Sequence, residues 1–395
     1  MSDSSSPSFA PGSPRSQAVT IEEGYLPWGP PAGGTAPAGG APAGWRSVTL
    51  RNGQLEVVLL PEKGGEIYAL RSLTRGVDLL WKSPWGPGLP PLPSASGEAS
   101  QTAWLDHYGG GWQELFPNAG AACTVDGAAH PFHGEASVVP WSYRLGTHVT
   151  PEGEELPQVQ LEVRLARSPF RLQKRISLDS RRPLLHVWER VTNESRQRRP
   201  YIWGQHPAFG APFLAGGCRL DVPAGGYVAA DPQVSPRSPV VPGARSPWPH
   251  VTSARATGAA GQQKVDLSVV PPPEAEVDTL GFLVDLSAGW YALSNEALGL
   301  GFALTWPLEV FSCLWLWQEL GGTLDYPWYG AAYVMGVEPH TSCPADGLAA
   351  AVQRGNARSL GPGESVEVEL RAVLFTPQGR VNAVSPEGDV AFASP

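Results

Sequence analysis

Hydrophobic and polar residues alternate along several stretches of this chain. Within residues 159–165, aliphatic side chains alternate with Gln160, Glu162 and Arg164, and residues 366–372 repeat the pattern. Because successive side chains of a β-strand point to opposite faces, a period of two is typical of a strand with one buried and one solvated face. The pattern therefore predicts antiparallel strands that pack on a core with one side only.

A meander of strands is predicted from about Trp45 onward. The Asn52-Gly53 dipeptide lies between two β-rich runs, which indicates a hairpin. The run "LEVVLLP" is predicted to be a strand, and "PEKGG" turns the chain into a returning strand, "EIYALRSL". This part of the chain is therefore expected to form antiparallel pairs between sequence neighbours.

One short helix is predicted, in "ADGLAAAVQRG", and it is expected to end at Gly355. The 42 prolines and 46 glycines oppose long helices over most of the chain. Neither a repeat period nor βαβ alternation is present, which disfavours a Rossmann or TIM-barrel arrangement. Many short strands between turn signals predict an all-β fold, a large antiparallel β-sandwich or barrel.

Three regions are predicted from composition along the 395 residues. Residues 1–43 are rich in Ser, Pro, Gly and Ala, so we expect a mostly disordered segment. Residues 44–378 are expected to form the β-sandwich domain, and residues 379–395 a short C-terminal tail.

Charge and cysteine content exclude several classes of protein. A formal net charge of −9 argues against nucleic acid or an anionic membrane surface as partner, because both attract basic patches. The segment Arg196–Pro200 is the densest basic run and is interpreted as a solvated turn. Four cysteines without CxxC spacing indicate neither a zinc ribbon nor a disulfide scaffold. Without an apolar leader or a run of about 18 apolar residues, a soluble cytoplasmic protein is expected.

Candidate chemistry is concentrated in segments where polar and aromatic residues accompany glycines. Imidazole and carboxylate groups in such segments can transfer protons near neutral pH. Aromatic faces beside hydrogen-bonding groups suit a sugar, whose C–H groups stack on rings while its hydroxyls take the polar partners. Segments of this kind at strand ends are typical of ligand sites on a rigid sheet. They are Tyr108–Gly120, His130–Trp141, Tyr201–Gly210, Leu314–Gly330 and Tyr333–Pro344.

The segment "HPFHGE" raises the alternative of a metal site made by His130, His133 and Glu135. Ligands three residues apart suit one face of a helix better than a strand. The prolines and glycine around them oppose a helix, so the sequence argues against a metal site at these residues. A serine nucleophile and a phosphate-binding loop are not indicated either, because no GxSxG or GxxxxGK[ST] motif is present.

Several motifs occur in the same order as in a known family. "LPEKGGEI" comes first, then "HGE" with a later "PW", then "ERVTNES", "WGQHPAF", "GVEP", "PADGL" and "LGPGES". From about Trp45 to about Thr376 the chain resembles the aldose 1-epimerases, or galactose mutarotase-like proteins. The resemblance implies that family's all-β supersandwich fold.

The resemblance also implies an activity, that of an isomerase that interconverts the anomers of a free aldose. In the family, acid/base catalysis opens the sugar ring at C1 without metal, nucleotide or covalent intermediate. By position, Glu338 would be the base that takes the C1 hydroxyl proton, and His206 the acid that protonates the ring oxygen. His133 would donate a hydrogen bond to the sugar. The expected partner is a small-molecule sugar, with no cofactor.

Further sugar contacts are expected, each with an ordinary structural alternative. The chain has "HGE" where common mutarotases have "HGG", and Ala119 follows Asn118 where they carry an arginine. For each candidate tryptophan, stacking on a sugar and packing in the core are equally good interpretations. For Glu135, a salt bridge is as good an interpretation as a sugar contact. The expected substrate-binding residues are Trp112, Asn118, Glu135, Asp285, Trp315 and Trp317.

Two other functions compete with the mutarotase. The first is a non-catalytic carbohydrate-binding or sensing protein of the same fold, since a fold does not fix a function. The second is a glycosidase that pairs Glu338 with Glu135 or Glu114, which requires carboxyl groups about 5–9.5 Å apart across the sugar. A hexose-phosphate epimerase is disfavoured, because no pair of arginines accompanies the site motifs.

Overall fold

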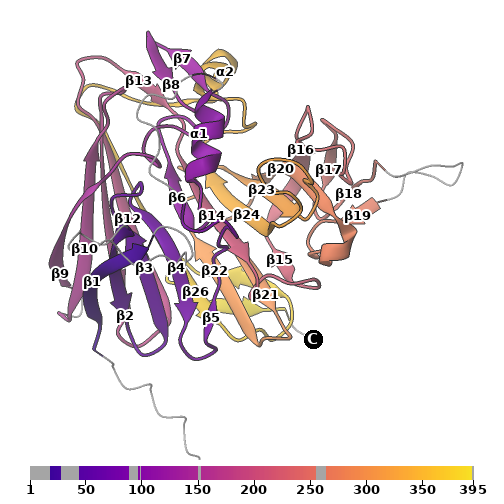
Figure 1. Cartoon of the computed structure of the whole chain (residues 1–395), viewed down its shortest axis with the longest axis horizontal. Coiled ribbons are helices and arrows are strands. Elements are labelled where there is room, and N and C mark those ends of the chain that lie inside the picture. Colours follow the sequence, from indigo (N-terminus) through magenta and orange to yellow (C-terminus); the bar gives the residue numbers. More distant parts are fainter. Residues whose placement is uncertain are drawn as a thin grey trace, which may run out of the picture.

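The computed structural model describes residues 18–27, 44–88, 97, 99–149, 153–254 and 264–393. Two large antiparallel sheets dominate it and face each other across a common core (Figure 1). The larger sheet has twelve strands and the smaller one eight. The fold is therefore the all-β antiparallel sandwich that the alternating pattern predicts.

Both sheets are built largely from chain neighbours. The larger sheet contains, in spatial order, β1 (Thr20–Pro27), β2 (Gly44–Arg51), β3 (Leu55–Leu60), β4 (Glu66–Ser72), β6 (Trp112–Leu115), β14 (Gly204–Gly210), β24 (Tyr333–His340), β23 (Cys313–Leu320), β20 (Val277–Leu286), β16 (Ala224–Ala229) and β17 (Arg245–Pro247), with β5 (Val77–Asp78) beside β4. The smaller contains β15 (Arg219–Asp221), β21 (Trp290–Asn295), β22 (Leu300–Thr305), β26 (Ser365–Phe375), β12 (Leu184–Asn193), β11 (Phe170–Leu178), β10 (Glu155–Arg164) and β9 (Ser142–Val149).

Short elements cover the ends of the sheets. They are the strand pairs β7 (Cys123–Val125) with β8 (Ala128–His130), β13 (Arg199–Tyr201) with β25 (Arg358–Leu360), β18 (His250–Thr252) with β19 (Lys264–Asp266) and β27 (Val381–Val384) with β28 (Val390–Phe392), and the helices α1 (Ala99–His107), η1 (Pro273–Ala275) and α2 (Leu348–Arg354). Figure 1 shows α1 and α2 at the same end of the sheets. No helix in the described part of the chain is long and apolar enough to cross a membrane.

The predicted hairpin at Asn52-Gly53 is confirmed. Strands β2 and β3 pair with Arg51 opposite Glu56. The Asn52 side-chain oxygen accepts hydrogen bonds from the backbone N–H groups of Gln54 and Leu55, at 2.8 and 2.7 Å. Asparagine is favoured in turns because its side chain can bond the backbone two residues on in this way.

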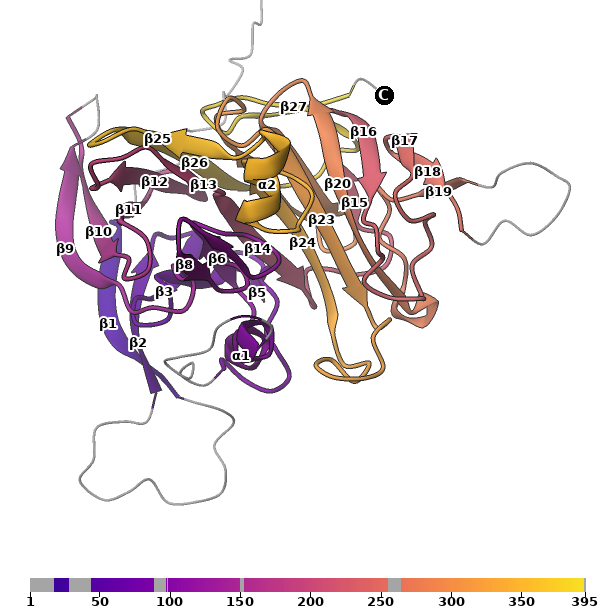
Figure 2. The same ribbon diagram turned by 90° about the horizontal axis from the view of Figure 1, so that it is seen from above.

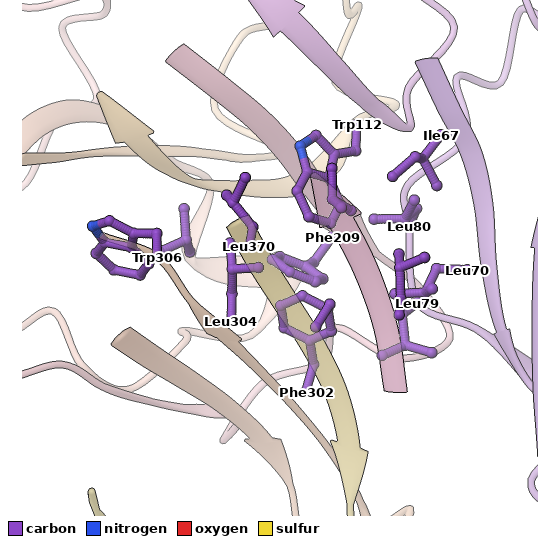
Figure 3. Close-up of a cluster of buried hydrophobic side chains, with 14 of the residues drawn as sticks. Ile67, Leu70, Leu79, Leu80, Trp112, Phe209, Phe302, Leu304, Trp306 and Leu370 are labelled. Carbon is purple, nitrogen blue, oxygen red and sulfur yellow. The ribbon is translucent and has the colours of Figure 1, made fainter. Parts of the chain in front are cut away.

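The main core lies between the two sheets, where their inner faces meet (Figure 3). Trp112 and Phe209 enter it from the larger sheet, and Phe302, Leu304 and Leu370 from the smaller one. The Phe209 and Phe302 rings meet across the sandwich, with centroids 4.9 Å apart. Full burial of each such side chain contributes about 1.5–3 kcal/mol, so this layer fixes how the sheets face each other.

A charged network also joins the two sheets in their interior. The Lys174 ammonium on β11 lies 2.7 Å from the Glu114 carboxylate on β6 and 3.1 Å from that of Glu189 on β12. The Gln205 amide donates to Glu189 at 2.8 Å, and the Trp203 indole donates to Glu114. Buried charges are tolerated only when paired and hydrogen-bonded, and here every charge has a partner from another strand.

The described parts of the two terminal regions form paired strands. Within the segment 1–43, β1 pairs with β2 over eight residues, from Thr20 opposite Arg51 to Pro27 opposite Gly44; the other residues expected there, 1–17 and 28–43, lie outside the described part. Within the expected tail 379–395, strands β27 and β28 pair and lie on the smaller sheet beside Trp290; residues 394 and 395 lie outside the described part. Composition gives no sign of these strands, because paired edge strands can be short and polar.

The predicted helix is confirmed as α2, and its last residue is followed by Gly355 with φ 75°. Glycine takes this left-handed conformation without steric cost, which explains why the helix ends there. Helix α1 was not predicted. It places Trp104 beside the other aromatic residues described next.

Candidate active site

One cavity of about 590 Å³ contains the three residues proposed for catalysis, His133, His206 and Glu338. It lies against β14, β20, β23 and β24 of the larger sheet, next to α1. Residues from segments far apart in the sequence line it. These include Gln101, Trp104, Phe132, His133, His206, Asp231, Val234, Asp278, Phe282, Trp315, Trp317, Glu319, Thr323, Tyr326, Trp328, Glu338 and Asp346.

Strand register brings His206 and Glu338 together. Strands β14 and β24 are antiparallel, with Gly204 opposite His340 and Ala208 opposite Gly336. His206 and Glu338 are the matching positions midway between these two pairs. Cross-strand neighbours of this kind lie about 5 Å apart at their Cβ atoms, close enough for their side chains to interact.

The Glu338 carboxyl lies between two imidazoles. Its Oε1 is 3.6 Å from Nε2 of His206, and its Oε2 is 3.3 Å from Nε2 of His340. His340 is stacked on Trp315, with ring centroids 3.7 Å apart and planes 5° apart. A Cβ atom on Gly204 would overlap the His340 ring, so glycine at that position is what makes room for it.

Burial shifts the pKa values of this cluster in opposite directions. Glu338 is 2% exposed, and burial raises its pKa well above the ordinary range. Burial also lowers the pKa of His206 to about 4, and that of His340 well below its usual value. These shifts favour a protonated carboxyl beside neutral imidazoles. Carboxyl and imidazole groups with opposed shifts in one cavity are typical of acid/base sites.

His133 is oriented by the backbone of a neighbouring loop. Its Nδ1 accepts a hydrogen bond of 3.1 Å from the backbone N–H of Gly120. Since burial lowers the pKa of His133, the ring is neutral, and its proton is then on Nε2. The backbone at His133 is left-handed, with φ 58°, and Gly134 follows with φ 76°. Such a conformation is uncommon for histidine, and it directs this ring toward the cavity.

Aromatic rings form much of the remaining wall. Trp315 and Trp317 line the cavity, as expected for sugar contacts, and Trp328 lies beside Trp317 with ring centroids 6.0 Å apart. Trp104 from α1 lies edge-on to His133, at 4.6 Å between centroids. Flat aromatic walls with a few polar groups are typical of sites for small polar ligands such as sugars.

Four of the expected substrate contacts lie outside the cavity, and each has another structural role. Trp112 is buried between the sheets, where its indole N–H donates to Gln205 at 2.7 Å (Figure 3). The Asn118 amide donates to the Pro131 carbonyl at 2.8 Å, which holds the loop that carries His133. We therefore interpret Trp112 as a core residue and Asn118 as a residue that positions His133.

Glu135 and Asp285 are also engaged elsewhere. The Glu135 carboxylate accepts hydrogen bonds from the backbone N–H groups of Ala166 and Arg167, at 3.2 and 3.1 Å. Asp285 is exposed and forms an ion pair with Arg245 on β17. Because neither Glu135 nor Glu114 lines the cavity, the carboxylate pair that a glycosidase would need with Glu338 is not formed by either of them.

The metal alternative finds no support in the geometry. His133 lines the cavity, whereas His130 does not. Among the described residues, no group of three or more His, Cys, Asp or Glu side chains could hold a metal ion.

His340, buried beside the cavity, and Asp278 and Glu319 in its lining are not among the expected site residues. His340 follows Glu338 by two residues, so the period of a strand places both on one face. Asp278 and Glu319 are cross-strand neighbours on β20 and β23, and no motif indicated them. The Thr323 hydroxyl is 2.8 Å from Oδ2 of Asp278 and also bonds Oε2 of Glu319. One hydroxyl has one proton to share between the two carboxyl groups, so protonation of one of them would complete the network.

Charge at this second group of carboxyls is reduced by burial. Burial raises the pKa of Glu319 to about 7 and raises that of Asp278 as well. Five carboxyl groups line the cavity, those of Asp231, Asp278, Glu319, Glu338 and Asp346, whereas no described lysine or arginine lines it. The cavity therefore offers hydrogen-bond partners for hydroxyl groups but no cation for an anionic ligand.

Comparison with known proteins supports the fold. The model of a family described as a domain of unknown function, DUF4432, matches residues 42–374. A Klebsiella pneumoniae protein provisionally named an aldose 1-epimerase is similar in structure, with a TM-score of 0.67, 18% identity and coverage of 92% of this chain and 85% of its own. A galactose mutarotase-like protein from Clostridium acetobutylicum has a TM-score of 0.55 and 15% identity, and covers 92% and 99%. No curated protein sequence matches the chain. The fold is thus galactose mutarotase-like.

Proposed function

We propose that this chain, which belongs to the family described as a domain of unknown function, DUF4432, is an aldose 1-epimerase that interconverts the anomers of a free, uncharged sugar. The observation that carries this proposal is the approach of His206 to Glu338, 3.6 Å apart in a cavity walled by aromatic rings. The names of the structural relatives support it only at the level of the fold.

The reaction needs one proton removed and one added. A base takes the proton of the C1 hydroxyl, the bond between C1 and the ring oxygen breaks, and an acid protonates that oxygen. The resulting aldehyde rotates about the C1–C2 bond, and the reverse steps close the ring on its other face. Carboxyl and imidazole groups side by side supply both functions.

Glu338 and His206 are close enough to exchange a proton, which burial keeps on Glu338 in the free protein by raising its pKa and lowering that of His206. Passing the proton of the Glu338 carboxyl to His206 gives a carboxylate and an imidazolium without exchange with solvent. The carboxylate is then the base for the C1 hydroxyl, and the imidazolium is the acid for the ring oxygen. His133, with its proton on Nε2, donates a hydrogen bond to the sugar, and His340 holds the other carboxylate oxygen.

The proposal is tested by measuring anomer exchange on a panel of free aldoses. Polarimetry or NMR exchange spectroscopy would follow the approach of a freshly dissolved pure anomer to equilibrium. We expect acceleration over buffer that is proportional to protein concentration for at least one aldose. Binding of sugars without acceleration of any of them would instead assign a carbohydrate-binding protein.

Phosphorylated sugars are expected to be poor substrates. The lining contains carboxyl groups but no described lysine or arginine, so a phosphate dianion would be desolvated there without a cation to pair with. We expect kcat/KM for an aldose 6-phosphate to be at least about 100-fold below that for the free aldose. Rates measured by NMR exchange at low and high salt would check this, since screening should reduce the difference. Equal rates for both sugars at low salt would contradict it.

A methyl group at Gly336 is expected to displace the Glu338 carboxyl. A Cβ atom built at Gly336 overlaps Oε1 of Glu338, which can move aside without any backbone shift. Because misplacement by about 1 Å can cost 10²-fold in rate, we expect Gly336→Ala to lower kcat by up to about that factor. Gly226→Ala on β16 is the matched control, since its methyl meets no atom closer than 3.3 Å. A Gly336→Ala protein with unchanged kcat would contradict the proposed role of Glu338.

A further inference from the structure

Exposed aromatic residues continue the cavity wall out to the surface. Tyr326 lines the cavity and is 43% exposed, whereas Tyr329 and Trp85 are 59% and 57% exposed. Their rings follow one another, with centroids 6.5 Å apart for Tyr326 and Tyr329 and 6.2 Å for Tyr329 and Trp85. Exposed apolar residues are ordinarily scattered singly, so three adjoining rings at the mouth of a cavity indicate a binding surface.

These rings are held in place by hydrogen bonds to two separate segments. The Trp85 indole N–H donates to the Pro327 carbonyl at 3.3 Å. The Tyr326 hydroxyl donates to the Asp106 carboxylate at 2.8 Å, which ties the loop between β23 and β24 to α1 (Figure 2). A surface whose rings are fixed before binding loses little conformational freedom when a ligand stacks on it.

Tyr329 adopts a conformation that its side chain disfavours. Its backbone is left-handed, with φ 49°, which is uncommon for a bulky residue. The conformation is maintained by backbone hydrogen bonds from Tyr329 to Asp325 at 2.9 Å and from Gly330 to Thr323 at 2.7 Å. The Trp85 and Tyr329 rings meet edge to face, at 79° between planes, so neither ring lies flat on the other. Strained residues of this kind concentrate at ligand sites.

We propose that Trp85, Tyr326 and Tyr329 form a second sugar subsite, so that the substrate is the reducing end of an uncharged oligosaccharide. This inference rests on the proposed function, because only the reducing-end ring has a free anomeric hydroxyl for Glu338 and His206. That ring occupies the cavity, and the next ring stacks on the exposed aromatic residues at its mouth. The volume of about 590 Å³ agrees with this, since cavities of ~300–1,000 Å³ bind ligands larger than one sugar ring.

The charges around the mouth of the cavity favour an uncharged oligosaccharide as the ligand. Asp231 and Asp346 line the cavity and are exposed, Asp346 in an ion pair with Arg354, and no described lysine or arginine lines the cavity itself. An oligosaccharide with carboxylate, sulfate or phosphate groups would therefore find no cation in the cavity lining to pair with. A neutral oligosaccharide has only hydroxyl groups for these carboxylates and C–H faces for the rings.

The inference is tested by comparing a monosaccharide with its own di- and trisaccharides. The wild-type protein is expected to have a higher kcat/KM for the longer sugars of at least one series, measured by NMR anomer exchange. Trp85→Ala and Tyr329→Ala are each expected to lower the ratio of kcat/KM for trisaccharide to monosaccharide by roughly 3- to 10-fold, the effect of losing one stacked ring. Tyr329→Phe keeps the ring and is expected to restore the ratio.

A tyrosine elsewhere on the surface provides the control. Tyr25 on β1 is 50% exposed and does not line the cavity, so Tyr25→Ala is expected to leave the ratio unchanged. If the ratio falls equally in Tyr25→Ala, or does not fall in either Trp85→Ala or Tyr329→Ala, the second subsite is wrong while the epimerase activity stands. Calorimetric titration tests the subsite when no activity is found. If the trisaccharide binds, and binding is lost in Trp85→Ala and Tyr329→Ala, but no sugar is turned over, only the epimerase activity is contradicted.

Discussion

Replacement of Glu338 by glutamine is expected to lower the catalysed rate of anomer exchange by about 10²–10⁴-fold, the usual contribution of a positioned proton-transfer group. Glutamine has the same size and keeps a hydrogen-bonding oxygen, so His206 and His340 retain a neighbour. It can neither take the proton of the C1 hydroxyl nor pass one to His206. The change therefore removes proton transfer and leaves the cavity otherwise intact.

The measurement is kcat and KM from NMR exchange or polarimetry on the best aldose found, with saturation-transfer NMR to follow binding. We expect kcat to fall while the sugar still binds, since the aromatic wall of Trp315 and Trp317 is unchanged. Glu367→Gln, on an exposed face of β26, is the matched control and should retain full activity. An unchanged kcat in Glu338→Gln would contradict the assignment of the base.

The sandwich could be predicted because its strands have a solvated face. In β10 and β26 the alternation of aliphatic and charged residues follows the burial of each side chain. Strands buried on both faces, such as β3, were recognised by composition and flanking turns. Helix α1 was not, because "ASQTAWLDH" carries no apolar stripe. Its Trp104 is instead held by stacking on Tyr108, with centroids 4.6 Å apart, a tertiary contact that no local pattern encodes.

The order of motifs predicts some of the site residues. It does not predict those whose position depends on the register between paired strands. His133, His206 and Glu338 lie in one cavity because β14 pairs with β24, and the order of motifs alone suggested it. Trp112 and Trp315 could not be distinguished in the sequence, since the face that each occupies depends on strand pairing. A strand period of two would place Glu135 on the same face as His133, but the left-handed backbone at His133 and Gly134 breaks that period.

A second large effect is expected for stability. Lys174→Met removes the ammonium that lies 2.7 Å from Glu114 and 3.1 Å from Glu189 in the interior. Removal of one partner from a buried ion pair typically costs about 3–5 kcal/mol, because the remaining charge is left without compensation. We expect a decrease of that size in the free energy of unfolding at pH 7, measured by urea denaturation.

The pKa values indicate which carboxyl is left without compensation. Burial raises the pKa of Glu114, but the Lys174 ammonium and its hydrogen bonds outweigh this and hold it below the ordinary value. Burial and then the neighbouring Glu114 carboxylate raise the pKa of Glu189 well above its usual range. The network therefore consists of one ammonium, one carboxylate and one carboxyl that holds a proton. Lys174→Met strands the Glu114 carboxylate, and Lys174→Met with Glu114→Gln is expected to recover most of the loss.

The pH dependence of the loss separates charge from packing. Without the ammonium, burial raises the pKa of Glu114 above its unfolded value, so the folded variant binds an extra proton and is destabilised as pH rises. Protonation of a carboxyl with an unfolded pKa of ~4.3 costs about 3.7 kcal/mol at pH 7 and about 1 kcal/mol at pH 5. The difference between wild type and Lys174→Met should therefore shrink by about 2–3 kcal/mol between these pH values. An equal difference at both would show that the lysine stem stabilises the sandwich by packing, and that the network joining β6 to β11 and β12 is not held by charge.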